Sequence, residues 1–112
     1  MINGINSREM ILEILLEIEE GEHSHVAIRN ALSKYQFLPK QDRAFITRVC
    51  EGTLEYRIQI DYIINSFSKV TVDKMKPAIR EILRSAVYQL KYMDSVPDSA
   101  VCNEAVKLAQ RK

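Results

Sequence analysis

The segment from Ile79 to Leu90 constrains the fold most, because its apolar residues recur at the spacing of one helical face. They follow one another in steps of three, one, three, one and three: Ile79, Ile82, Leu83, Ala86, Val87 and Leu90. This period is that of an α-helix with one face in a core. Val96-Pro97 then interrupts the helix, because the residue before a proline avoids the α conformation. The segment predicts a long amphipathic helix and, from Asp98 onward, a further helix.

Four earlier segments have the same period. We expect a first helix that Ser7 caps and Gly21 ends, and further helices over 24–34, 39–56 and 58–67. The inward residues of the fourth are expected to be Ile60, Ile63, Ile64 and Phe67. Arg57 either continues the third helix or bends it. Asp73 is expected to cap the long helix, with Pro77 near its first turn. The predicted fold is an all-α bundle of about six helices.

Composition agrees with one helical domain over 1–112. Of the 112 residues, 46% are hydrophobic and 28% are charged, as in an ordinary globular protein. Only three Gly and three Pro leave little room for a turn-rich β architecture. The apolar runs are too short for a membrane span, and no signal peptide is recognised. The chain stops inside its expected last helix, so we expect a C-terminally truncated fragment of a longer protein.

No set of residues indicates catalysis or metal binding. Cys50 and Cys102 form no CxxC motif, and both are expected on apolar faces as small hydrophobic residues. Free thiols favour a cytoplasmic location. His23 and His25 point in different directions on a helix and are expected at the surface. Gly52 lies mid-helix, where glycine costs about 1 kcal/mol relative to alanine. We expect a close approach of two helices there, with a local kink as the alternative.

Charge is unevenly distributed along the chain. The net charge is only +1, but residues 1–33 carry two basic and six acidic residues, and residues 34–112 carry fourteen and nine. One side of the long helix carries four cations: Lys76, Arg80, Arg84 and Lys91. They can contact successive phosphates of a nucleic acid. Alternatively, Arg80 and Arg84 lay their stems on the core and pair with carboxylates. Tyr88 and Tyr92 either stack on bases or lie at the edge of the core.

Several motifs resemble one known family. Asp42-Arg43-Ala44-Phe45, Glu51-Gly52-Thr53-Leu54 and Asp61 resemble the central helices of the NusB-like family. The C-terminal part resembles the family's "LR…YQLLYLD-VP…NEAV" pattern through Ile82-Leu83-Arg84, Tyr88-Gln89-Leu90, Tyr92-Met93-Asp94, Val96-Pro97 and Asn103-Glu104-Ala105-Val106. The resemblance implies an all-helical RNA-binding domain. Such domains occur alone, as transcription antitermination factors, and at the N-terminus of small-subunit rRNA cytosine-5 methyltransferases of the RsmB (Sun/Fmu) type.

Two features make the chain more similar to the methyltransferase version. Antitermination factors begin with an arginine-rich helix, whereas Asn6-Ser7-Arg8-Glu9 has a single arginine before the sequence turns acidic. The segment Leu15–Leu32 also resembles the start of the methyltransferases. This implies small-subunit rRNA and the protein's own C-terminal methyltransferase domain as partners. S-adenosylmethionine and the nucleophilic cysteine would belong to that domain, with no cofactor in this fragment.

The candidate RNA contacts are Arg8, from the resemblance, and Arg80, Arg84 and Lys91, from the stripe on the long helix. Arg43 is expected to be structural and to pair with a carboxylate such as Asp61. Two other functions stay open. One is a stand-alone antitermination factor that acts with a ribosomal-protein partner. The other is a module that packs on its own catalytic domain without binding RNA.

Overall fold

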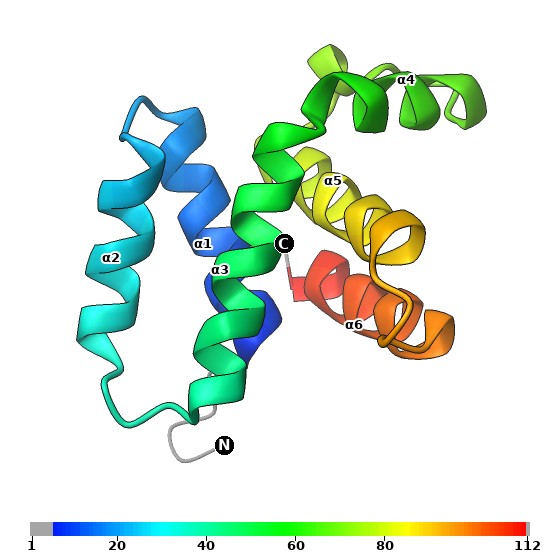
Figure 1. The fold of residues 1–112 in the computed structure, drawn as a ribbon. Helices are drawn as coiled ribbons and strands as arrows, with labels where there is room; N and C mark the ends of the chain where they lie inside the picture. The colour runs from blue at the N-terminus through cyan, green and yellow to red at the C-terminus, as the bar shows by residue number, and fades with distance from the viewer. Residues whose placement is uncertain (1–5, 112) are drawn as a thin grey trace.

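A computed structural model of the chain describes residues 6–111. They form six α-helices and one short 3₁₀ helix: α1 (Ser7–Glu19), α2 (Ser24–Lys34), α3 (Lys40–Glu55), α4 (Arg57–Phe67), η1 (Val72–Lys74), α5 (Pro77–Tyr92) and α6 (Asp98–Arg111). No strand occurs within this range. Figure 1 shows α1, α2 and α3 side by side, with α5 and α6 next to them and α4 projecting outward. The predicted all-α bundle is confirmed.

The helix ends differ from the prediction at two places. Asn6, not Ser7, caps α1: its side-chain oxygen accepts a hydrogen bond from the Glu9 amide at 2.9 Å. An Asn side chain accepts from the amide three residues further on, as an N-cap residue does, so the helix begins at Ser7 itself. Asp73 does not cap α5 but lies in η1, because α5 begins only at Pro77, whose fixed φ suits the first helical position. Gly21 ends α1 with φ 118°, as predicted.

The chain bends at Tyr56, so Arg57 begins a new helix. Tyr56 has φ −102° and ψ 20° and separates α3 from α4. Helix α4 packs mainly against α5, and only Ile60 and Ile64 are buried on it. The prediction for Phe67 was wrong, because 84% of this residue is exposed. One covering helix buries a narrow stripe, and Phe67 lies outside it.

Helix α5 is the centre of the bundle. It contacts α1, α3, α4 and α6. Its buried residues therefore include polar ones as well as the expected Ile82 and Ala86: Glu81, Arg84, Ser85, Tyr88 and Gln89. Leu90, at the end of the predicted apolar face, is 41% exposed. A helix with neighbours on several sides buries more than its apolar stripe.

The two cysteines have different surroundings. Cys50 is fully buried in the core, as predicted, and burial raises the pKa of its thiol. Cys102 is exposed, which corrects the expectation that it lies on an apolar face. On α6 the buried residues are Val101 and Leu108, and Cys102 follows the first of them around the helix, beyond the covered stripe.

Gly52 lies where α3 packs directly against the Tyr88 side chain of α5. A Cβ atom placed on Gly52 would overlap the ring of Tyr88. Helix α3 runs without interruption from Lys40 to Glu55, so the glycine does not divide the helix. The predicted close approach is confirmed, and Tyr88 is the residue that requires it.

Candidate nucleic-acid interface

Arg84 is the most enclosed of the predicted RNA contacts. Its Nε and Nη2 donate to the two carboxylate oxygens of Asp61 on α4, each at 2.8 Å. Its Nη1 donates to Glu81 at 2.7 Å. Only 10% of the Arg84 side chain is exposed. Two-point pairing of this kind fixes the guanidinium in one orientation, so Arg84 joins α5 to α4.

Arg80 makes a second set of contacts one turn earlier. Its Nε donates to Glu19 of α1 at 3.0 Å, and its Nη2 pairs with the other oxygen of Glu19. Its Nη1 donates to the backbone carbonyls of Val72 at 2.9 Å and Met75 at 3.0 Å. Arg80 therefore ties the end of α1 to the segment between α4 and α5.

These contacts build one charge cluster, made of Glu19, Asp61, Arg80, Glu81 and Arg84. The hydrogen bond from Arg80 lowers the pKa of Glu19 to about 2. Two effects raise the pKa of Glu81 to about 8: burial, which is the larger, and a hydrogen bond with Glu19. The two carboxyl groups thus favour opposite protonation states. The cluster accommodates a neutral Glu81 beside an ionised Glu19.

We expect the combined contribution of Glu19 and Glu81 to the free energy of unfolding to be highest near pH 4.5, the ordinary pKa of a glutamate. Because the pKa of Glu19 is lowered, its contribution exists above pH 4.5 and is lost as the pH falls toward 2. Because the pKa of Glu81 is raised, its contribution exists below pH 4.5 and is lost as the pH rises through 8. Urea unfolding from pH 3 to 9 measures this. Glu81→Gln should flatten the decline above pH 4.5, and an equal decline in this variant would contradict the assignment.

Arg8 and Lys91 lie apart from this cluster. Arg8, on the first turn of α1, is half-buried: its Nε donates to Gln89 at 3.2 Å, and its guanidinium lies 5.3 Å from the ring centre of Phe45. Burial lowers the pKa of Arg8. Lys91 is exposed, with Nζ 5.6 Å from the ring centre of Tyr92. Only Arg80 and Arg84 are therefore brought together, and Lys91 is the most accessible of the four. RNA contact at all four positions stays a prediction.

Arg43 is structural in a different way from the one expected. Its Nη1 donates to the carbonyls of Leu32 at 3.0 Å and Tyr35 at 3.1 Å, at the end of α2. It does not pair with Asp61, whose carboxylate is taken by Arg84. A cation at a helix C-terminus satisfies its open carbonyls. Arg43 thereby holds α2 against α3.

Three tyrosines stack on one another: Tyr56, which follows α3, and Tyr88 and Tyr92 of α5. The ring centre of Tyr92 lies 4.4 Å from that of Tyr56 and 5.4 Å from that of Tyr88. Tyr88 is only 5% exposed, while Tyr56 and Tyr92 are partly exposed. The position of Tyr88 fits the core-edge alternative better than stacking on a base.

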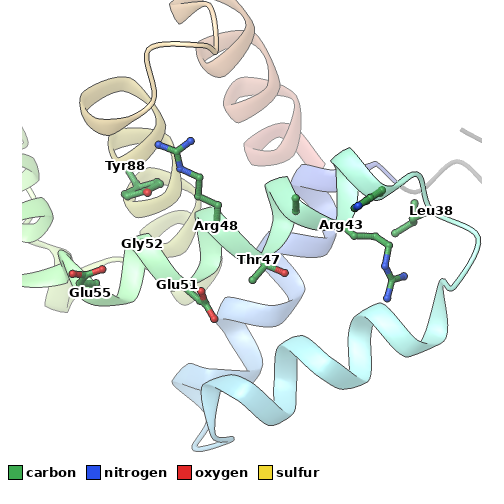
Figure 2. A pocket seen from close by; sticks show the side chains of 10 residues that line it. Leu38, Arg43, Thr47, Arg48, Glu51, Gly52, Glu55 and Tyr88 are labelled. Carbon is green, nitrogen blue, oxygen red and sulfur yellow. The ribbon is translucent and has the colours of Figure 1, made fainter.

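A groove along the exposed face of α3 was not predicted from the sequence. It has a volume of about 700 Å³ and is lined by Leu38, Lys40, Arg43, Ala44, Thr47, Arg48, Glu51, Gly52, Glu55 and Tyr88. Figure 2 shows these side chains along α3, with Tyr88 of α5 beside Gly52. A signal was present: cations and small residues recur on one face of this helix.

Within residues 6–111, no three potential metal ligands lie together. None of the helices in this range is both long and apolar enough to cross a membrane. The described residues form a six-helix bundle with a largely buried cluster of ion pairs and a groove lined by cations. These features define an all-helical domain whose notable polar groups are paired or exposed charges. The chain belongs to the NusB family, whose sequence model matches residues 5–112. The resemblance seen in the sequence is confirmed.

The relatives carry two kinds of name. The chain is 31% identical over 103 residues to the probable ribosomal RNA small subunit methyltransferase B of Bacillus subtilis, covering 92% of this chain and 23% of that protein. Its identity to the Synechocystis protein of the same name is 34% over 107 residues, covering 95% and 24%. It is 31% identical over 106 residues to the transcription antitermination protein NusB of Acetivibrio thermocellus, covering 93% and 72%. The chain spans about a quarter of the length of the two methyltransferase relatives.

Proposed function

We propose that this chain is the N-terminal RNA-binding and docking domain of a bacterial, cytoplasmic small-subunit rRNA cytosine-5 methyltransferase. The observation that carries this proposal is the start of α1, where Arg8 is the one arginine and the exposed side continues with Glu13 and Glu17. The similarity to two proteins named as ribosomal RNA small subunit methyltransferases supports it.

In this proposal the domain positions the enzyme on its RNA substrate and takes no part in the methyl transfer itself. Methyl transfer from S-adenosylmethionine to cytosine belongs to a catalytic domain outside these residues. The domain holds small-subunit rRNA through its phosphates, with Arg8, Arg80, Arg84 and Lys91 as proposed contacts. Lys91 is exposed, so its ammonium group could contact a phosphate without any rearrangement. Arg80 and Arg84 would have to exchange their internal carboxylate partners for phosphate.

A binding titration tests the proposal. Fragments of small-subunit rRNA are titrated with the domain at low and moderate salt, by filter binding or fluorescence anisotropy. We expect binding at low salt that weakens as salt rises, with a slope that reports the number of phosphates contacted. Lys91→Glu should weaken binding and flatten this slope. An affinity that does not change with salt concentration would contradict phosphate contact. Absence of binding at low salt would reject an RNA-binding function.

The second candidate is a stand-alone transcription antitermination factor. The identity to the Acetivibrio thermocellus NusB protein favours it, since the chain covers 72% of that relative. The coding sequence discriminates between the two. An open reading frame that ends soon after one more helix supports an antitermination factor. A long continuation with a glycine-rich strand–turn–helix motif for a nucleotide cofactor supports the methyltransferase.

The third candidate is a domain-packing module, and the surface of α4 favours it. Ile58 is 86% exposed and Tyr62 76% exposed. Together with Gln59, Ile63 and Lys91 they line a second groove of about 600 Å³. Exposed apolar patches of this kind often mark protein contacts. Failure to bind RNA at low salt would favour this candidate.

A further inference from the structure

The groove along α3 is a cation-bearing surface that the proposed contacts do not use. Its lining residues on α3 follow one another in alternating steps of three and one from Lys40 to Glu55, so they lie on one face of the helix along its whole length. Ala44 and Gly52 are small, so they leave space between the longer side chains that line the groove. At about 700 Å³ the groove lies within the size range of ligand-binding sites in proteins.

The charges of the groove are separated along its length. Lys40, Arg43 and Arg48 line the half nearer the start of α3, and Glu51 and Glu55 line the other half. The start of a helix also carries the positive end of the helix dipole. One half therefore favours an anion and the other does not.

Lys40 and Arg48 hold their charges differently from Arg80 and Arg84. Both are exposed, and within residues 6–111 neither is among the cations paired with a carboxylate. Arg48 makes one long hydrogen bond, 3.4 Å, to the Tyr92 carbonyl. Eight residues of helix separate the two by about 12 Å. That spacing lets them contact different phosphates of one strand.

We propose that the α3 groove holds one strand of RNA, with phosphates at Lys40 and Arg48 and base edges at Glu51 and Glu55. The inference rests on the proposed RNA-binding function and adds a second RNA-binding surface to it. Carboxylates can accept hydrogen bonds from base amino groups, such as N4 of cytosine. They also repel phosphate, which sets the direction in which the backbone faces. The cations thus hold phosphates in one half of the groove, and the strand turns so that its bases, not its phosphates, face the carboxylates in the other half.

The test compares the wild-type domain with the double variant Lys40→Gln/Arg48→Gln. The probe is a single-stranded RNA of about 12 nucleotides, within the range of single-strand site sizes. For single strands, each lost phosphate contact lowers the salt slope by about 0.7. We therefore expect the slope to fall by about 1.4 and the affinity to fall about 25-fold at 0.1 M salt. A duplex of the same sequence should bind both proteins with nearly equal affinity.

The matched control is Lys69→Gln/Lys107→Gln, which removes the same charge from exposed positions outside the groove. It should change affinity less than threefold. If the wild type binds RNA and both double variants bind equally well, the groove is not the site, but the proposed function stands. If the wild type does not bind RNA at all, the proposed function itself fails. Circular-dichroism melting of each variant checks that the fold is unchanged.

Discussion

Replacing Arg84 with methionine should lower the free energy of unfolding by about 3 kcal/mol, near the lower end of the range for breaking a buried ion pair. The reason is that Asp61 would lose its cation and Glu81 would lose its hydrogen-bond donor while both stay largely enclosed: 22% of the Asp61 side chain and 5% of the Glu81 side chain are exposed. Methionine keeps most of the apolar stem of the arginine side chain. Urea unfolding at pH 7 measures the change.

Two controls bracket this prediction. Lys107→Met breaks a surface pair with Glu104 in which 62% of the lysine side chain is exposed, and should cost at most about 0.5 kcal/mol. Adding Asp61→Leu to Arg84→Met removes the stranded charge and should recover part of the stability. A loss below about 1 kcal/mol in Arg84→Met would contradict the structural role of this arginine.

The same variant separates two roles of Arg84. RNA binding is measured at a temperature where the variant remains folded. If Arg84 acts only inside the domain, affinity and salt slope should match the wild type. A reduced salt slope in a folded protein would show that Arg84 also contacts phosphate.

Gly52→Ala should also destabilise the protein, by about 1–3 kcal/mol, although alanine favours a helix more than glycine does. The added methyl group would overlap the Tyr88 ring. That ring is enclosed by α3 and by Tyr56 and Tyr92, so it cannot swing away freely. Thermal and urea unfolding measure the effect.

The matched control lies on the same face of α3. Ala44→Gly should cost about 1 kcal/mol from helix propensity alone, so the two substitutions would change stability in the same direction for opposite reasons. In the background Tyr88→Ala, Gly52→Ala should lose most of its penalty, because the overlap is gone. A stabilising Gly52→Ala in the wild-type background would refute the close approach.

Much of the fold could be predicted because the apolar period is a local property. The steps in Ile79–Leu90 and the turn signals at Gly21 and Val96-Pro97 define helices without reference to the rest of the chain. The exceptions are informative. Phe67 continues the apolar spacing of α4 but is exposed, because periodicity describes a face and not what covers it.

The candidate site was less predictable because an arginine can either bind a phosphate of RNA or pair with a carboxylate inside the domain. Arg80 and Arg84 have the spacing of a phosphate-binding stripe, and their spacing is equally that of cations paired with Glu19 and Asp61. Their partners lie 61 and 23 residues away in the chain. No local pattern gives those distances.

The helical class, the approximate positions of the helices, the membership of the NusB family and the need for a small residue at position 52 could all be inferred from the sequence. Each of these depends on residue type and on spacing along one helix. Other features became visible only in the folded bundle: α5 lies at its centre, the arginines of α5 face carboxylates, and Lys40 and Arg48 face a groove. Pairing and burial depend on which helices become neighbours, and segments far apart in the chain meet only when the bundle has formed.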